Sequence, residues 1–115
     1  MTDKFVQVVF SNPVEGKEDE FNEWYDHVHI PELLAVPGML SVTRYALHEA
    51  AIYHVSGGVV PAHKYMCVYE LEGDVDKVMA RIQQRVASGE VHMSDSLDLS
   101  TSRVSFWTRG KAFEA

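Results

Sequence analysis

The chain has 115 residues, 46% of them hydrophobic, and a formal net charge of −7 at pH 7. This length and apolar content predict one domain, spanning residues 1–115, with a small but real core. The acidic balance argues against nucleic-acid binding, which needs a basic face, and no stretch approaches the roughly 18 apolar residues of a membrane span. The N-terminus has no signal-peptide pattern and Cys67 is the only cysteine, so we expect a cytoplasmic protein.

The first half of the chain predicts a strand, a helix and a second strand. Residues Phe5 to Phe10 read as a strand. From Glu15 to Ile30 the apolar positions recur with the i, i+3, i+4, i+7 spacing of a half-buried helix, at Phe21, Trp24, Tyr25 and Val28. Pro31 lacks a backbone donor and is expected to stop or kink this helix. The second strand runs from Met39 to Leu47.

The middle of the chain combines an irregular segment with a strong strand. Residues Glu49 to Ala62 contain Gly57, Gly58 and Pro61, which predict a loop or an irregular hairpin. Lys64 to Leu71 then predicts the third strand, the clearest of the four.

The last third predicts a second helix and a fourth strand. Asp74 can cap a helix whose apolar positions follow helical spacing, at Val75, Val78, Met79, Ile82 and Val86. Ser88-Gly89 ends that helix. Thr101 to Thr108 predicts the fourth strand, and the short tail from Arg109 to Ala115 can dock on a partner.

This order of elements predicts an α+β, ferredoxin-like βαββαβ fold with a four-stranded antiparallel sheet. Two helices cover only one face of such a sheet. Both faces of the third strand are apolar, with Met66 and Val68 on one side and Tyr65, Cys67 and Tyr69 on the other. A second copy of the same sheet is the economical cover for the remaining face, so we expect a homodimer.

The segment from Phe21 to Glu32 carries the candidate catalytic residues. At about 100° per residue, Tyr25 and His29 stack on one flank of the apolar stripe, and His27 lies on the opposite flank. His29 and Tyr25 can therefore face a space between helix and sheet. There His29 can exchange protons and the Tyr25 hydroxyl can position a substrate oxygen. In the alternative, His29 packs at the helix end and hydrogen-bonds a backbone carbonyl freed by Pro31.

Four further residues are candidate substrate-binding residues. Trp24 is a core residue of the same helix. Arg44 lies within a strand, where its charge needs a carboxylate or a substrate anion as partner. His48 and His63 bracket the irregular segment and can line the mouth of a pocket, although solvated loop histidines would look the same.

The sequence predicts no metal site. His27 and His29 point to opposite sides of a continuous helix and can chelate one ion only if the helix breaks before Pro31. Glu23 and His27 have a suitable spacing, but one carboxylate and one imidazole are too few ligands.

Residues 22–32, Asn-Glu-Trp-Tyr-Asp-His-Val-His-Ile-Pro-Glu, resemble the dimeric α+β barrel superfamily, with EthD-like and related uncharacterised proteins as the nearest members. Val36-Pro37-Gly38-Met39 and Arg44-Tyr45 extend the resemblance, which covers residues 5–47, whereas the second half agrees in layout only. The resemblance implies sheets paired into a shared barrel and a ligand held between sheet and helices. It maps the family histidine onto His29.

The superfamily includes aromatic-polyketide cyclases, muconolactone isomerase, cofactor-free quinol monooxygenases, haem-binding enzymes and accessory proteins. The resemblance implies a cofactor-free lyase, isomerase or cyclase acting on a hydrophobic or aromatic carbonyl-bearing molecule, with His29 as general base and Tyr25 placing the oxygen. A quinol monooxygenase and a non-catalytic ligand-binding or accessory protein of a catabolic pathway stay open. No haem is implied: a haem protein needs a proximal histidine, and the sequence places none, with His63 and His92 left open for that role.

Overall fold

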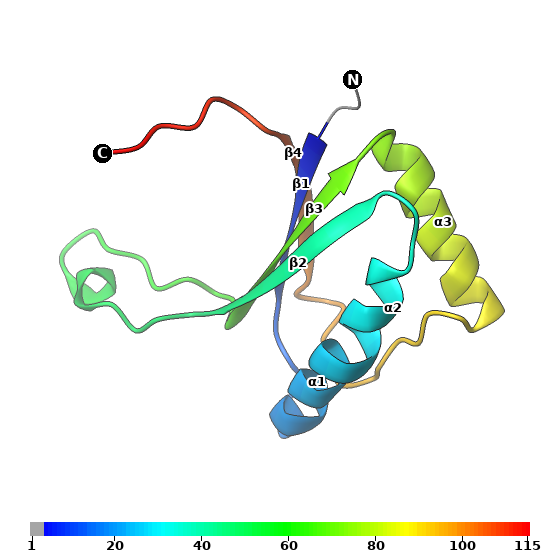
Figure 1. The fold of residues 1–115 in the computed structure, drawn as a ribbon. Coiled ribbons are helices and arrows are strands. Elements are labelled where there is room, and N and C mark those ends of the chain that lie inside the picture. Colours follow the sequence, from blue (N-terminus) through cyan, green and yellow to red (C-terminus); the bar gives the residue numbers. More distant parts are fainter. Residues whose placement is uncertain (1–3) are drawn as a thin grey trace.

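The computed structural model describes residues 4–115, which form a four-stranded antiparallel sheet with helices on one face (Figure 1). The strands follow the order β2-β3-β1-β4 across the sheet. They are β1 (Lys4–Ser11), β2 (Met39–Ala46), β3 (Tyr65–Glu72) and β4 (Arg103–Thr108). This order confirms the predicted α+β, ferredoxin-like fold. The predicted strands were correct apart from shifts of one or two residues at their ends.

The first helical run continues through Pro31. It consists of α1 (Glu18–Trp24), a π-helical turn (Tyr25–His29) and α2 (Ile30–Leu34). In the π turn, the N–H of Ile30 donates to the carbonyl of Tyr25, five residues back. Of the two expectations for Pro31, a stop was wrong, and the helical run is instead distorted into a π turn just before it. A proline inside a helix offers no N–H and crowds the preceding turn, and the wider π turn next to it accommodates both effects.

The second helix, α3 (Val75–Ser88), has the predicted bounds. The Asp74 side chain accepts hydrogen bonds from the N–H groups of Asp76 and Lys77, which caps the helix N-terminus. Gly38, with φ 99°, fixes the start of β2 against this helix, since a Cβ atom there would lie 2.6 Å from a methyl group of Val78. None of the helices in residues 4–115 is long and apolar enough to cross a membrane.

The core lies between the sheet and the helices. From the helical run it takes Phe21, Trp24, Tyr25 and Leu33, and from β3 it takes Cys67, Tyr69 and Leu71. These β3 residues alternate with Met66 and Val68, which lie on the other face of the strand. The two faces of β3 thus separate as predicted, and Tyr69 points toward the helices.

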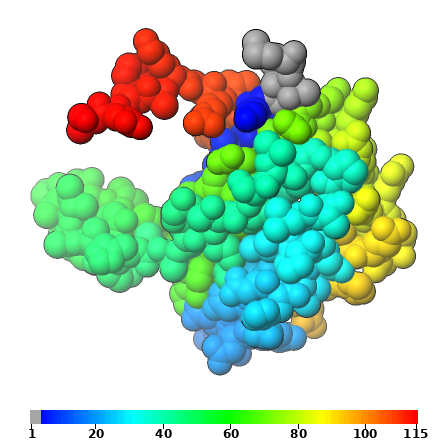
Figure 2. All heavy atoms as spheres, in the orientation of Figure 1, coloured from blue at the N-terminus to red at the C-terminus, as the bar shows by residue number. Residues whose placement is uncertain are grey.

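Two segments extend away from the body of the molecule, as Figures 1 and 2 show. One is the arm, which we define as residues 47–64 and which contains a single 3-10 turn (Ala51–His54). The other is the C-terminal tail, residues 109–115. Both carry exposed apolar side chains, namely Ile52, Val55 and Val59 in the arm and Phe113 in the tail. The sheet face opposite the helices also has exposed apolar side chains, which include Phe10, Tyr45 and Trp107.

Candidate functional site

A cavity of about 450 Å³ lies between the helices and the sheet. We call it the inner cavity. Its walls come from the helical run, α3, three strands and the connection between α3 and β4, and they are mostly apolar. The polar side chains among its lining residues are Gln7, Tyr25, His29, Tyr69, Gln83 and Ser102. A cavity with few polar groups on apolar walls suits a small hydrophobic molecule.

His29 lines this cavity from the end of the π turn and is 9% exposed. Its ring stacks on Trp24, with 4.4 Å between centroids, and meets the Tyr25 ring edge-on at 5.4 Å. Its Nδ1 atom is buried and has no hydrogen-bond partner among the described residues. Nδ1 therefore does not bond a backbone carbonyl freed by Pro31. A buried polar atom without a partner costs free energy, which a ligand can recover.

Burial lowers the pKa of His29 to about 4, although the nearby charge of Glu32 acts in the opposite direction. The imidazole is consequently neutral at physiological pH. No hydrogen bond to Nδ1 fixes which ring nitrogen carries the proton. A neutral ring is the form that can accept a proton.

Two buried tyrosines share the inner cavity with His29. Burial raises the pKa of Tyr25, and the hydroxyls of Tyr69 and Ser11 oppose that shift. Burial also raises the pKa of Tyr69. Both phenols therefore stay protonated. The Tyr69 hydroxyl donates to Tyr25, and the Tyr25 hydroxyl can donate in turn to a substrate oxygen.

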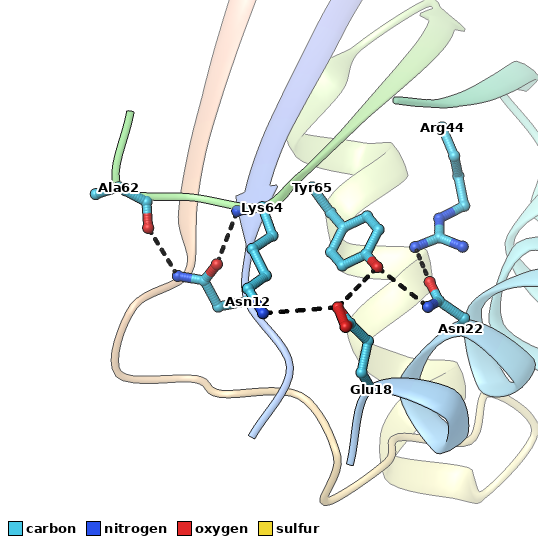
Figure 3. A network of polar contacts seen from close by, with 7 residues as sticks. All are labelled: Asn12, Glu18, Asn22, Arg44, Ala62, Lys64 and Tyr65. Carbon is cyan, nitrogen blue, oxygen red and sulfur yellow. Dashed lines mark hydrogen bonds and ion pairs between the residues drawn. The ribbon is translucent and has the colours of Figure 1, made fainter. Parts of the chain in front are cut away.

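Arg44 lies against the Tyr25 ring, with its guanidinium carbon 4.6 Å from the ring centroid. As expected, it pairs with a carboxylate: its Nη1 is 2.9 Å from Asp26 Oδ1, and its Nη2 donates to Asn22. Figure 3 shows the contact of Arg44 with Asn22 at one end of a polar network that runs through Tyr65 and Glu18 to the base of the arm. Arg44 is not among the residues that line the inner cavity. Its position supports Tyr25 and does not provide a substrate contact there.

His48 and His63 lie elsewhere, in a second cavity of about 620 Å³ at the base of the arm. This cavity includes Phe10, Tyr45 and Met66, so it opens on the sheet face away from the helices. The His63 Nε2 atom lies 2.7 Å from the carbonyl oxygen of Thr101. The structure thus separates these two histidines from His29 by the thickness of the sheet.

The structure also places Trp24, His27 and the possible metal ligands. The ring of Trp24 stacks on that of His29, and the Trp24 Nε1 atom donates to the carbonyl of His92 at 2.9 Å. His27 is exposed and lies 3.7 Å from Glu23, away from His29 as predicted. Within residues 4–115, no three histidine, cysteine, aspartate or glutamate side chains are placed to hold a metal ion.

Part of the cavity wall could not be identified from the sequence. The alternation of β3 placed Tyr69 on the same face as Cys67, but the face that meets the helices was not predicted and nothing marked Tyr69 as a site residue. The connection between α3 and β4 has no periodic pattern, yet it contributes Met93, Leu97, Leu99 and Ser102. The positions of these residues depend on the path of the connection, and no local sequence pattern predicts that path.

Comparison with known proteins identifies the fold. No family model and no curated protein matches the chain. Two solved structures share its architecture over nearly its whole length. A "putative monooxygenase" from Shewanella loihica PV-4 has a TM-score of 0.61 at 14% identity, covering 97% of this chain and 99% of its own. An ethyl tert-butyl ether D (EthD) family protein from Bacillus halodurans C-125 has a TM-score of 0.58 at 17% identity, covering 98% and 100%.

These matches define the class of protein, a small ferredoxin-like α+β protein with the fold of EthD family proteins. The resemblance inferred from residues 5–47 therefore holds at the level of the fold. Similarity at 14% and 17% identity carries no activity across to this chain.

Proposed function

We propose that the protein is a cofactor-free enzyme, a lyase, isomerase or cyclase, that moves a proton on a hydrophobic or aromatic carbonyl-bearing molecule. The observation that carries this proposal is His29, a buried neutral imidazole with an unpartnered Nδ1 in an apolar cavity. Perturbed titratable groups in a cavity are typical of catalytic sites.

In the proposed reaction, His29 takes a proton from a carbon next to the substrate carbonyl. Negative charge then develops on the carbonyl oxygen, and the Tyr25 hydroxyl, which accepts a hydrogen bond from Tyr69, donates to it. In the apolar cavity the imidazolium and the enolate stabilise each other strongly, which offsets the low pKa that burial gives to His29. Return of the proton at another atom completes an isomerisation or sets up ring closure or elimination.

A quinol monooxygenase is the second candidate, favoured by the similarity of the fold to that of the Shewanella protein, which is described as a "putative monooxygenase". In that reaction His29 would deprotonate a phenol hydroxyl, and the resulting quinolate would react with molecular oxygen. Oxygen consumption, followed with an electrode during incubation with quinols, distinguishes this candidate from proton transfer alone.

The test of the first candidate is deuterium exchange. In D₂O, NMR follows the loss of the α-proton signal from a panel of aromatic ketones. We expect the protein to accelerate exchange of at least one of them, and His29→Gln to reduce that rate by about 10²–10⁴-fold, the usual contribution of a general base. His27→Gln, an exposed histidine on the same helical run, is the matched control and should keep the full rate.

Equal exchange rates in the His29→Gln variant and the wild type would show that His29 is not the base. Saturable binding of the panel in the inner cavity, with neither exchange nor oxygen consumption, would favour a ligand-binding or accessory protein instead.

A further inference from the structure

In the connection from Gly89 to Ser102, His92 makes hydrogen bonds to two residues of the helical run. Trp24 Nε1 donates to the His92 carbonyl at 2.9 Å. The backbone N–H of His92 donates to Glu32 Oε1 at 2.8 Å, and its Nδ1 lies 2.6 Å from Glu32 Oε2. Three contacts thus converge on His92, immediately before Met93 in the cavity wall.

Both partners of His92 are neighbours of His29. Trp24 provides the ring on which His29 stacks. Glu32 follows His29 by three residues in the helical run, a spacing that places two side chains side by side. Since His92 holds both carboxylate oxygens of Glu32, that side chain cannot rotate freely into solvent, and it is only 22% exposed.

Glu32 is also the charged group that acts on His29. The residues that β1, β3 and α3 contribute to the inner cavity are uncharged, with Gln7, Tyr69 and Gln83 the polar ones. Burial acts to raise the pKa of Glu32, but the hydrogen bonds from the backbone and the side chain of His92 lower that pKa and outweigh the effect of burial. Glu32 is therefore ionised at neutral pH. Other charged groups near His92 line a hollow on the outer surface: Glu20, Glu23, His27 and Asp95.

We propose that Glu32 is a positioning residue for His29. Its carboxylate, oriented by His92, stabilises the imidazolium that forms when His29 accepts a proton, and the contact of His92 with Trp24 keeps the stacked ring in place. This inference rests on the proposed role of His29 as the base. It adds a connection, through Glu32, between the buried imidazole of His29 and the imidazole of His92, which is 66% exposed.

The test is an NMR titration of the imidazole signals, assigned through the His29→Gln variant. In the wild type we expect His29 to titrate at about pH 4. In Glu32→Gln the stabilising charge is gone, so His29 should stay unprotonated down to the pH at which the protein unfolds. Glu23→Gln removes an exposed carboxylate beside His27 on the same helical run and is the matched control, with unchanged titration of His29.

His92→Ala is the second variant, since the exposed His92 ring can be removed with little effect on the core. Without the His92 ring, Glu32 keeps the hydrogen bond from the backbone N–H of residue 92 but loses the contact with Nδ1. We therefore expect the pKa of His29 to fall and the Trp24 indole N–H signal to shift. On substrates that exchange, Glu32→Gln should lower kcat by about tenfold or less with KM unchanged, because the imidazolium that forms in the transition state loses its charged neighbour.

Titration of His29 at the same pH in the wild type, Glu32→Gln and His92→Ala would overturn this inference. That measurement needs no substrate, so its outcome is independent of the exchange assay that judges the proposed function.

Discussion

At the scale of single residues, the inner cavity depends on one imidazole held in its neutral form. A free histidine has a pKa of about 6.5, and burial lowers the pKa of His29 to about 4. The unfolded chain therefore takes up a proton between these two values and the folded chain does not. The free energy of unfolding should decrease as the pH falls through this range.

This difference makes a prediction for stability. Between pH 7.5 and pH 4, His29 should lower the free energy of unfolding by up to about 3 kcal/mol, since each pKa unit is worth about 1.4 kcal/mol. Urea unfolding at both pH values measures the loss. His29→Gln has no group to protonate there and should lose less stability on acidification. If the variant and the wild type lose the same amount, His29 is not held neutral by the fold.

At the same scale, the pair Tyr25 and His29 could be predicted from the sequence because an i, i+4 spacing is a local property of the helix. The separation of His48 and His63 from that pair could not. Both lie at the ends of the arm, and which face of the sheet a loop residue reaches depends on contacts distant in sequence. Glu32 and His92 were missed for a related reason, since they are 60 residues apart and meet through the connection between α3 and β4.

At the scale of elements, β1, β3 and α3 were predicted closely because each is encoded by its own pattern: alternation in the strands, and a capped apolar stripe in α3. The π turn was not, because helical periodicity was applied to residues 15–30 as a regular helix. Most of the arm was predicted as a loop or an irregular hairpin, since its Gly and Pro residues favour no repeating structure. The structure agrees, with a single 3-10 turn in this segment.

The π turn leads to a prediction about Pro31. In Pro31→Ala an N–H returns and the crowding of the preceding turn is relieved, so the run can become a regular α-helix. We expect stability to change by no more than about 1 kcal/mol, while the π turn closes and moves His29 relative to Trp24. Chemical shifts of the His29 ring and the Trp24 indole measure that movement, and the exchange rate should decrease with it.

Unchanged ring shifts in Pro31→Ala would mean that the π turn is maintained by the core and not by the proline. A matched substitution, Pro37→Ala, lies outside the helical run and should leave both signals in place.

At the scale of the whole molecule, the sheet face away from the helices remains uncovered in a single chain. Phe10, Tyr45 and Trp107 are exposed on or beside this face, and the arm and the tail add further apolar side chains. Exposed apolar surface of this kind marks an interaction site. We propose that a second copy of the chain covers it, as the two-faced apolar pattern of β3 predicts.

The dimer is tested by light scattering after size-exclusion chromatography. We expect twice the chain mass of 13.0 kDa at micromolar concentration. Trp107→Glu should shift the protein to a monomer, because it buries a charge in the proposed interface. Leu34→Glu, at an exposed apolar position in α2, is the control and should remain dimeric. A wild-type mass of one chain would refute the proposal.

The position of Cys67 has a practical consequence. It is the only cysteine in the chain, it lies in the core two residues from Tyr69, and burial raises the pKa of its thiol. A thiol reagent can reach it only when the packing around the tyrosines loosens. Its labelling rate therefore reports how often this part of the core opens, and slower labelling in the presence of a compound would serve as a screen for ligands without any engineered tag.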